Sequence, residues 1–537
     1  MPPEKPTRSS AICQASCARS ASSGSAAAIA PAEPTRLRAR TARANMDHII
    51  LRTGRRRNGL HAHRQMARIV HGSREGHTLA DRRTDVAGEG RRARRAEGMA
   101  RREFLRFGAA AAALGGRLTI LAADAPAQKL GVAVVGARGM GGYSLDQGIK
   151  ERLVAIVEIE DKRAAEAMKI VQERAKDAPP PRVYTDYRKM LDECHKDLDV
   201  VLSGTPDHHH APASIRAIQL GKHAFAQKPL AHNIYECYAL AKAAREKKVC
   251  TQMGNQGYCD EGMRRLVEFT WAGAIGNVTE THTILGRNFG GSGGRPPSKP
   301  VPEGLHWDEW LGPAPAREYH DGLHPFSWRS WRQFGTGTIG DMACHHLARI
   351  FWPLKIYTLK KFSVTCLHTK GGSDEMYPQD NVLLWELPER EGQPPCKVYA
   401  YDHGGLKPEV MKEVEKKYDR KFGEASLLIG DKGLMGHEPY IITEERRNDF
   451  KPPEKTLPRA HGGPIEDLFW CIRNGGTPAS NFPDAAGPLT AWVLTGHLAM
   501  FAGVGKKLEW DVEKMECTNV PEINRFVKRE YRKGWEV

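Results

Sequence analysis

The chain has 537 residues, enough for two or three domains, and a formal net charge of +16 at pH 7. The charge is concentrated, because residues 1–98 hold 20 Lys and Arg against 8 Asp and Glu, which leaves a net charge of only +4 for the other 439 residues. The part of the chain that can fold therefore lacks the basic surface of a nucleic-acid-binding protein, and we expect no nucleic-acid partner.

Two segments precede the first predicted strand. Residues 1–98 show no sustained apolar period, so we expect a disordered basic leader, or a translated segment upstream of a true start at Met99. Within residues 99–127, Arg101-Arg102 precedes an apolar region and Ala125-Pro126-Ala127. This order is typical of a twin-arginine signal peptide and predicts export to the periplasm. The apolar region is too short to span a bilayer comfortably, so we expect no stable membrane insertion.

The first predicted domain, residues 128–250, begins with a glycine-rich turn. An apolar run at 130–135 predicts a buried strand and leads directly into Gly136-Ala137-Arg138-Gly139-Met140-Gly141. Glycines in such a turn let the pyrophosphate of a dinucleotide approach the backbone. The turn departs from the G-x-G-x-x-G pattern, because Arg138 occupies the place of the middle glycine and Gly139 is displaced by one residue.

An acidic residue follows at the spacing that this kind of turn requires. The next apolar run, 153–159, carries Glu158 near its end, about 20 residues after the turn begins. A carboxylate at this position can accept hydrogen bonds from the ribose hydroxyls, which favours NAD as the cofactor. NADP stays open as the alternative, because Arg138, Lys162 and Arg163 are cations that can bind a 2′-phosphate.

The order of elements in residues 200–256 predicts a parallel sheet whose ligands bind beyond the carboxyl ends of its strands. The segment from Thr205 to His210 and the turn Gln227-Lys228-Pro229 both fall at that edge. His210 is expected to support the cofactor, whereas His208 and His209 are expected to face solvent. The predicted cofactor-binding residues are Gly136, Arg138, Gly139, Met140, Gly141, Glu158, Thr205, Pro206, Asp207, His210, Gln227, Lys228 and Asn255.

From Thr251 the pattern changes to alternating strands, glycine turns and aromatic residues, so we assign residues 251–537 to a second α/β domain. Aromatic rings beside Arg, His and Tyr suit sugar recognition, because rings stack on C–H faces and polar groups bind hydroxyls. The predicted substrate residues are Tyr319, His320, Arg332 and His345. Near the end of the chain, residues 526–532 are expected to form a short helix for docking or oligomerisation.

Asp341 and His345 are four residues apart and share one face if residues 341–351 are helical. The spacing alone is better explained by an ordinary hydrogen bond within a helix. The chemical alternative is oxidation of a secondary alcohol, in which a histidine takes the hydroxyl proton, a carboxylate orients it and a lysine stabilises the charge on oxygen. His346 is also a metal-ligand type, but it lies off the shared face, so we expect no metal site.

Several motifs together resemble one protein family over residues 130–537. They are RVYTDYRKMLDE, TPDHHHAPA, GKHAFAQKPLAHN, TQMGNQGY, WDEWLGPAPAREYH, GTGTIGDMACHH and FVKREYRKGWE, and their order resembles the Gfo/Idh/MocA oxidoreductases, especially the twin-arginine-exported branch. The resemblance implies an α/β protein with an N-terminal Rossmann domain that binds NAD or NADP. It also implies a second α/β domain with a large open, mainly antiparallel sheet, and a homodimer or homotetramer.

The resemblance also assigns roles to individual residues. The E-K-P motif of the family falls on Gln227-Lys228-Pro229, and its D-x-x-x-H motif falls on Asp341 and His345. It implies that His345 is the leading candidate for the base, Asp341 its partner, and Lys228 a proton relay or electrostatic clamp, although Lys228 and His345 can exchange roles. Glutamine at 227 replaces the usual glutamate and Ala343 a common glycine, and these departures weaken the transfer of a specific activity.

Three functions are consistent with these residues. The first is an exported NAD(P)-dependent oxidoreductase that moves a hydride between a retained nicotinamide cofactor and a secondary alcohol of a sugar, polyol or sugar derivative. The second is an NAD-dependent glycoside hydrolase or lyase that oxidises a sugar transiently and then eliminates. The third is a catalytically inactive sugar-binding protein, which the loss of the acid at Gln227 makes conceivable.

Overall fold

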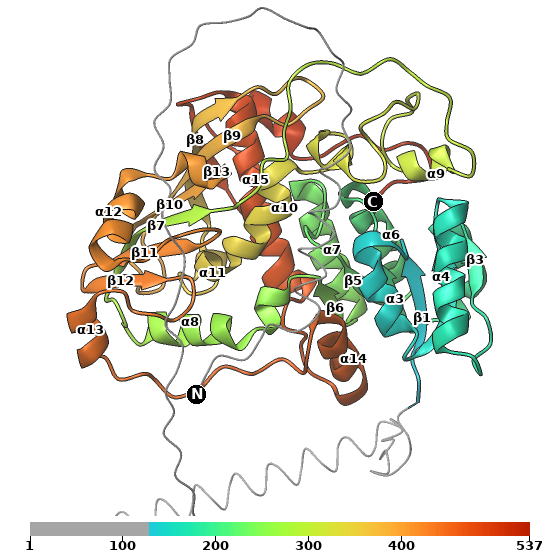
Figure 1. Cartoon of the computed structure of the whole chain (residues 1–537), viewed down its shortest axis with the longest axis horizontal. Coiled ribbons are helices and arrows are strands. Elements are labelled where there is room, and N and C mark those ends of the chain that lie inside the picture. Colours follow the sequence, from blue (N-terminus) through green and yellow to red (C-terminus); the bar gives the residue numbers. More distant parts are fainter. Residues whose placement is uncertain (1–127) are drawn as a thin grey trace, which may run out of the picture. The chain divides into compact units, whose positions relative to one another are not determined.

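The computed structural model describes residues 128–537, and these form two α/β domains (Figure 1). The predictions of a basic leader at 1–98 and of a signal peptide at 99–127 lie outside the described residues. The expected Rossmann domain and the expected second domain with a mainly antiparallel sheet are both confirmed.

The first sheet has six parallel strands in the order β3-β2-β1-β4-β5-β6. Its strands are β1 (Gly131–Val135), β2 (Arg152–Val157), β3 (Arg182–Tyr184), β4 (Val200–Ser203), β5 (His223–Ala226) and β6 (Thr251–Met253). Apolar runs form β1 and β4 because both faces of a parallel sheet are covered by helices. β6 pairs with β5, so this sheet extends past the domain boundary predicted at Cys250.

The helices of this domain begin where the sequence supplies a cap. Asp186 accepts a hydrogen bond from the backbone N–H of Arg188, and Asn233 accepts one from Glu236, which fixes the starts of α5 and α7. The helices are α3 (Gly142–Gly148), α4 (Asp161–Arg174), α5 (Tyr187–Cys194), α6 (Asp207–Gln219), α7 (Ile234–Lys247) and, from the second half of the chain, α14 (Pro464–Asn474). α14 joins this domain because Ile465, Leu468 and Phe469 pack into its core.

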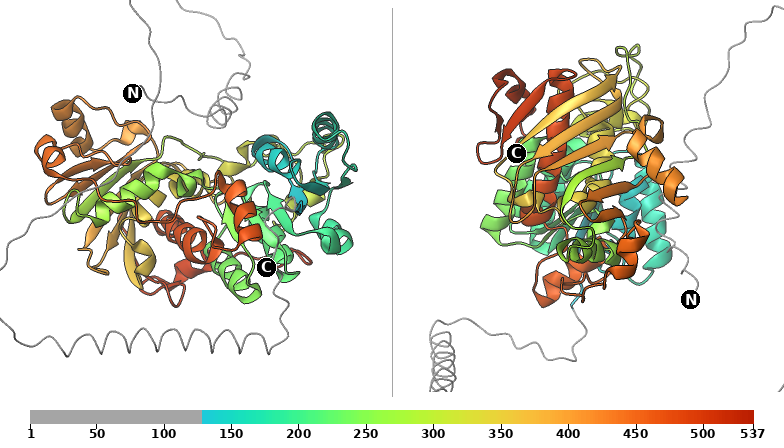
Figure 2. Two further views of the ribbon diagram at one scale, coloured as in Figure 1. Left: turned by 90° about the horizontal axis from the view of Figure 1, so that it is seen from below. Right: turned by 90° about the vertical axis from the view of Figure 1, so that its left-hand side faces the viewer.

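The second sheet has eight strands in the order β12-β11-β7-β10-β9-β8-β13-β14, and neighbours are antiparallel except β7 and β10. The right-hand view of Figure 2 shows these strands side by side. Its strands are β7 (Val278–Ile284), β8 (Lys361–Lys370), β9 (Gln379–Leu387), β10 (Cys396–Tyr401), β11 (Ser426–Gly430), β12 (Gly433–Gly436), β13 (Lys507–Asp511) and β14 (Glu516–Cys517).

One long apolar helix, α15 (Gly487–Ala502), joins the two domains through the largest hydrophobic core. Its Thr495 hydroxyl accepts a hydrogen bond from the indole N–H of Trp385 on β9 at 3.0 Å. A Cβ on Gly496 would lie 2.6 Å from the Leu383 side chain, so glycine allows α15 to approach the sheet closely. The other helices are α8 (Glu261–Trp271), α9 (Trp307–Leu311), α10 (Gly337–His346), α11 (Ala348–Phe351), α12 (Glu409–Tyr418) and α13 (Glu444–Asp449).

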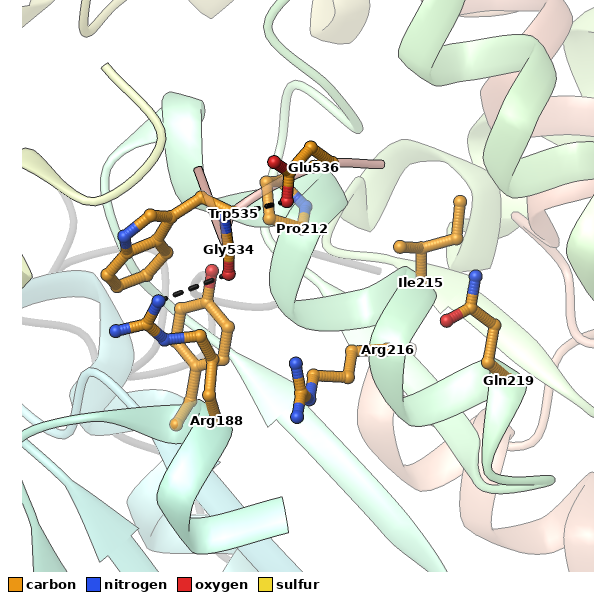
Figure 3. Close-up of a pocket in the computed structure, with 9 residues that line it drawn as sticks. Arg188, Pro212, Ile215, Arg216, Gln219, Gly534, Trp535 and Glu536 are labelled. Atoms are coloured by element: carbon orange, nitrogen blue, oxygen red, sulfur yellow. Dashed lines mark hydrogen bonds between the residues drawn. The ribbon is translucent and has the colours of Figure 1, made fainter. Parts of the chain in front are cut away.

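The C-terminal tail returns to the first domain (Figure 3). Trp535 is buried edge-on against Tyr187 and lies under the guanidinium of Arg188, which is 3.6 Å from the indole centroid. Arg188 also donates to the carbonyl of Gly534 at 3.1 Å. The helix predicted at 526–532 does not form, because a 3₁₀ helix ends at Phe526 and the tail then runs irregularly along side-chain anchors.

Two features of the described part bear on function. Across residues 128–537, no helix combines the length and the apolar character that crossing a membrane requires. Over the same residues, no three His, Cys, Asp or Glu side chains are grouped so that they could hold a metal ion.

Candidate active site

The glycine-rich turn lies at the carboxyl end of β1 and packs against the loop between β4 and α6. Gly136 has a φ of +77°, a conformation that favours glycine. A Cβ on Gly141 would clash with the carbonyl of Gly136, and one on Gly204 would lie 2.6 Å from the Cα of Gly141. The backbone segments therefore touch without side chains between them, and this narrow turn is the form that fits a dinucleotide pyrophosphate.

Glu158 is fixed against this turn from the end of β2. Its carboxylate accepts hydrogen bonds from the backbone N–H of Ala137 at 3.1 Å and from that of Ile159 at 3.0 Å. Burial raises the pKa of Glu158 above its usual range, although these two N–H groups act in the opposite direction. The carboxylate is thus held beside the glycine turn, and its predicted role of binding a ribose stays a prediction.

The sequence offers three cations that could bind the 2′-phosphate of NADP, namely Arg138, Lys162 and Arg163. Two of them are paired with carboxylates. The Arg138 Nε lies 3.1 Å from Glu166, and the Arg163 Nε lies 2.6 Å from Glu160. The residues at the end of β2 therefore fit the uncharged ribose edge of NAD better than a 2′-phosphate.

A segment of the second domain reaches back over the end of β2. The His306 N–H donates to the carbonyl of Ile159, and its ring Nε2 lies 2.9 Å from Asp161. The His324 Nε2 lies 2.9 Å from the Glu160 carboxylate. We call Glu160, Asp161, His306 and His324 the histidine clasp, and it holds the two domains together next to Glu158.

Lys228 and Asp341, which were both predicted to be catalytic but not to pair with each other, meet at the domain boundary. The Lys228 Nζ lies 3.1 Å from the Asp341 carboxylate and donates to its backbone carbonyl at 3.2 Å. The other carboxylate oxygen accepts from the Nε of Arg329 at 3.2 Å. We call these three residues the Lys228 cluster; the Lys228 and Arg329 side chains are 13% exposed and that of Asp341 only 6%.

The ion pairs within the Lys228 cluster determine which of its side chains are ionised. Burial alone would raise the pKa of Asp341, but the charges of Lys228 and Arg329 lower it to about 2, so the carboxylate is ionised. Burial alone would lower the pKa of Lys228, but the charge of Asp341 outweighs it and the pKa is raised. Lys228 is therefore a buried ammonium ion at neutral pH.

His345 follows Asp341 by one turn of α10, which confirms the predicted helix at this point. Its hydrogen-bond partner differs from the expectation: within the described residues, Asp341 bonds to Lys228 and Arg329, not to the His345 ring. The carboxylate oxygens are already occupied by stronger cationic donors. Burial and the Lys228 charge lower the pKa of His345 well below its usual range, so its ring is neutral.

Two hydrogen bonds between the domains hold α10 in register with the first sheet. The Asn255 amide donates to the carbonyl of Cys344 at 2.7 Å, and the Thr336 hydroxyl donates to Asp207 at 2.6 Å. Burial and the charge of Asp341 raise the pKa of Asp207 to about 7. Asn255 and Asp207 were predicted to bind the cofactor, but their side chains point to α10 and its preceding residue.

The three consecutive histidines are all buried, so the expectation that His208 and His209 face solvent is wrong. They lie in the first turn of α6, and both rings approach the carbonyl of Trp310 at 2.9 Å. His210 has the supporting position that was expected, because its ring bridges the carbonyls of Thr205 and Pro229 at 2.9 and 2.7 Å. It thereby ties the loop after β4 to the turn that carries Lys228.

The remaining predicted cofactor residues lie at the same edge. Met140, Thr205 and Pro206 are half-buried beside the glycine turn. Gln227 is buried, and its amide lies so close to Gly254 that a Cβ there would collide with it. This edge therefore carries a neutral amide where the resemblance leads one to expect a carboxylate, and the binding of the cofactor by these residues stays a prediction.

The three further residues predicted for substrate binding do not join the Lys228 cluster. His320 is buried, and its ring nitrogens contact Arg317 and the carbonyl of Asp321 at 2.7 and 2.6 Å. Tyr319 packs edge-on against Trp307. Arg332 lies over the ring of Phe501 and lines a separate cavity. Of the predicted substrate residues, only His345 lies on the helix that carries Asp341.

Both domains match sequence models of one oxidoreductase family. Residues 130–255 match the model described as its NAD-binding Rossmann fold, and residues 279–368 match the model described as its C-terminal alpha/beta domain. The chain belongs to the Gfo/Idh/MocA oxidoreductase family. Its first domain is accordingly a NAD-binding Rossmann domain, and the glycine turn and Glu158 are the residues that fit this cofactor.

Relatives of this Gfo/Idh/MocA protein match it over short stretches. An alpha-N-acetylgalactosaminidase of Shewanella oneidensis is 40% identical over 85 residues, 15% of this chain and 18% of that protein. A glycosyl hydrolase family 109 protein of Shewanella sp. strain W3-18-1 is 36% identical over 141 residues, 25% of this chain and 30% of that protein. The matches thus span less than a third of the length of these relatives.

Solved structures resemble the chain at low sequence identity. GenD2 from gentamicin A biosynthesis, in complex with NAD, has a TM-score of 0.46 and 18% identity, covering 72% of this chain and 97% of that one. Levoglucosan dehydrogenase, in complex with NADH and levoglucosan, has a TM-score of 0.45 and 18% identity, covering 71% and 99%. The aldose-aldose oxidoreductase from Caulobacter crescentus has a TM-score of 0.46 and 17% identity, covering 71% and 99%.

Sequence reasoning missed two parts of this oxidoreductase site. Arg329 precedes Asp341 by 12 residues, a spacing that no helical or strand period brings together. The clasp pair Glu160 and His324 is 164 residues apart and lies in loop sequence. Neither contact leaves a local pattern, so only the tertiary structure reveals them.

Proposed function

We propose that the protein oxidises or reduces a secondary alcohol of a sugar, polyol or sugar derivative, with NAD as its hydride carrier. The observation that carries the proposal is the buried Lys228 cluster with neutral His345 one helical turn away, at the carboxyl edge of a NAD-binding sheet. A buried ammonium ion, and a neutral imidazole one helical turn from the carboxylate that pairs with it, are the two groups that this reaction needs.

In the oxidation direction, Lys228 stabilises charge on the substrate oxygen. An ammonium group has three N–H donors, and two of them are directed at the carboxylate and the carbonyl of Asp341. The third donor is left for the alcohol oxygen, which becomes negative as its proton departs. Asp341 and Arg329 act as positioning residues, because they hold the ammonium group in place and do not need to contact the substrate.

His345 is the base in this proposal. NAD, when bound, supplies the acceptor for the hydride that leaves the alcohol carbon. A ring nitrogen of His345 takes the hydroxyl proton, so the alcohol loses one hydride and one proton and becomes a ketone. The lowered pKa of His345 supports this role, since the ring starts neutral at pH 7. Lys228 is the electrostatic clamp, because its raised pKa keeps it charged.

The test begins with the purified protein. We expect denaturation to release NAD, identified by mass spectrometry, and a panel of free sugars and polyols to yield one that reduces the bound or added nucleotide. Lys228→Met is expected to retain the nucleotide and lose the reduction. The alternative is the inactive sugar-binding protein. In that case the unsubstituted protein and Lys228→Met would neither release nor bind a dinucleotide, and both would bind sugar without turnover.

A second candidate is glycoside cleavage by transient oxidation, favoured by the relatives named glycosyl hydrolase family 109 and alpha-N-acetylgalactosaminidase. Here the same first step makes a ketone, which acidifies the neighbouring C–H. Loss of that proton expels the glycosidic oxygen, water adds to the resulting double bond, and return of the hydride restores the alcohol. No net change of the nucleotide results.

The two candidates give different products. Release of p-nitrophenol from p-nitrophenyl α-N-acetylgalactosaminide, with deuterium from D₂O retained next to the oxidised carbon, is expected only for cleavage. Net formation of reduced nucleotide with a free sugar is expected only for the dehydrogenase. Lys228→Met should abolish whichever activity is found, because both begin with the same oxidation.

We further propose that the protein is exported with its cofactor bound and works as a dimer or tetramer. The twin-arginine pair Arg101-Arg102 supports export of a folded protein, and a retained cofactor suits a compartment with little free nucleotide. Replacing both arginines by lysine should leave the protein in the cytoplasmic fraction. Light scattering of the purified protein tests the assembly.

A further inference from the structure

A second cavity, of about 240 Å³, lies between the start of α7, the end of α15 and the C-terminal tail. Its apolar lining is formed by Tyr377, Leu494, Leu498, Phe501 and Phe526. Its polar lining comes from five separate stretches of the chain. A cavity of this kind has room for a small organic molecule with one apolar and one polar end.

The charged groups of the cavity are almost all cations. Arg332, Arg525, Lys528 and Arg529 line it, against one carboxylate, that of Asp374. Arg332 is stacked 3.8 Å above the ring of Phe501, and burial lowers its pKa. None of these four cations forms an ion pair with Asp374 within the described residues. Arg529 is neutralised by Glu236, which leaves three cations and one carboxylate along the wall, an excess of two positive charges that favours an anion.

Several donors of the cavity wall also lack a partner. His232 is only 8% exposed, and neither of its ring nitrogens makes a hydrogen bond, although the carbonyls of Arg332 and Gly335 lie nearby. The Nε and one terminal nitrogen of Arg529 are likewise buried and unpaired. Such groups cost free energy when left unsatisfied, so their presence indicates a polar ligand.

The unpaired nitrogens of Arg529 are not free to move away. Its other terminal nitrogen is anchored 2.7 Å from Glu236 and donates to the carbonyl of His208 at 2.6 Å. That carbonyl has lost its helical donor, because Pro212 stands four residues later and has no N–H. Arg529 is thus fixed at one terminal nitrogen, while its Nε and other terminal nitrogen stay buried without a partner in the wall of the cavity.

The cavity is distinct from the site around Lys228. Thr336 and His497 stand between them: the Thr336 hydroxyl bonds to Asp207 on one side, and its carbonyl contacts the His497 ring at 2.8 Å on the other. No member of the Lys228 cluster lines the cavity. A ligand in this cavity would therefore be separate from the substrate at Lys228.

We infer that this cavity binds a small organic anion, whose carboxylate or phosphate group meets Arg529, His232 and the neighbouring cations while its ring or apolar body lies on Phe501 and Tyr377. The size of the cavity, its excess of cations and its unpaired buried donors all point to this class of ligand. The inference does not rest on the proposed reaction, because no group of that reaction is involved.

Isothermal titration with benzoate, phenyl phosphate and benzyl alcohol tests the inference on the purified protein. We expect at least one of the two anions to bind with a Kd of about 1 mM or tighter, and benzyl alcohol to bind at least about tenfold more weakly. The anion that binds more tightly distinguishes a carboxylate ligand from a phosphate ligand. Binding should persist in Lys228→Met, which separates this cavity from the active site.

Two variants report on the cavity without removing the anchored Arg529. Asn233→Asp keeps a good helix cap but adds a negative charge to the wall, and it should weaken the anion at least about tenfold. Arg525→Gln with Lys528→Gln should weaken it several-fold. The matched control, Lys416→Gln with Lys417→Gln on exposed α12, removes the same charge and should change nothing.

Three results would overturn the inference. The first is the absence of binding by either anion. The second is binding that depends on Lys228 or is unchanged by Asn233→Asp. The third is equal binding of benzyl alcohol, which would make the cavity an apolar site without an anion preference.

Discussion

The molecule contains two groups of charges that are organised in opposite ways. In the Lys228 cluster, both oxygens of the Asp341 carboxylate have a cationic donor, and its two cations share one anion. In the cavity around Arg529, four cations and one carboxylate line the wall, Glu236 pairs with Arg529, and buried donors of Arg529 and His232 lack partners. In the first arrangement the charged groups have partners within the protein, which fixes the geometry of their side chains. In the second arrangement the unpaired groups obtain partners only when a ligand is bound. We therefore associate charges that are fully paired within the protein with catalysis, and charges that lack protein partners with ligand binding.

The largest effect is expected from removing the ammonium group of the complete cluster. Lys228→Met should lower kcat by about 10³-fold or more, because the charge on the substrate oxygen then has no cation or donor. The measurement is turnover on the substrate found in the screen, with nucleotide content determined in parallel. Lys242→Met, at an exposed lysine of α7, is the control and should retain full turnover.

Removing the anion of the same cluster should affect folding more than removing the cation. Asp341→Asn leaves Lys228 and Arg329 buried without a counter-charge and should cost about 3 kcal/mol or more of unfolding free energy. Lys228→Met should cost less, because Asp341 keeps Arg329. Urea unfolding of both variants measures this difference, with Asp146→Asn in an exposed ion pair as a control of small effect. An equal loss in both would contradict the description of the cluster as held by Asp341.

The same pairing fixes how the cluster responds to acid. The folded-state pKa of Asp341 is about 2, below its usual value of 3.8. The stabilisation that this difference represents is fully present above pH 3.8 and is lost as the pH falls through about 2. In Asp341→Asn the free energy of unfolding should therefore depend less on pH between these two values.

The pH dependence of turnover tests which group is the base. The pKa of His345 is lowered well below 6.5 by burial and by Lys228, so its neutral, proton-accepting form persists to acid pH. We expect kcat/KM to stay level from pH 8 to below pH 6.5 and to fall only at lower pH. An acid limb at or above pH 6.5 would show that a different group accepts the proton.

The sequence predicted the start of the first sheet well because these strands have a local signal. The apolar runs at 130–135 and 153–159 match β1 and β2 within two residues, and the family motifs assigned Lys228 and Asp341, 113 residues apart, to one site. What it could not predict depends on single distant contacts. His208 and His209 look like an exposed polar run, yet the carbonyl of Trp310 and the tail arginine Arg529, 321 residues away, cover them.

The error over the substrate residues has a similar cause. Tyr319, His320 and Arg332 are of the right chemical types for binding sugars, but residue type does not specify direction. His320 is turned inward to Arg317, and Arg332 is turned to the second cavity. A cluster of aromatic residues in sequence therefore indicated a well-packed subdomain and not one binding surface.

The histidine clasp is intermediate between the two charge groups in how its charges are compensated, because its pairs are formed but partly exposed. A substitution in the clasp should give the smallest effect. The Glu160 and His324 side chains are 27% and 16% exposed. Glu160→Gln removes the charge that holds His324 and Arg163, so the segment over the end of β2 should open more often. Loss of bound NAD, followed by dilution and nucleotide fluorescence, should speed up by about two- to fivefold, the range for one partly exposed pair. Glu513→Gln, in an exposed pair of the second domain, should leave the rate unchanged. If Glu160→Gln released NAD no faster, the clasp would only join the domains, and cofactor retention would have to come from the first domain alone.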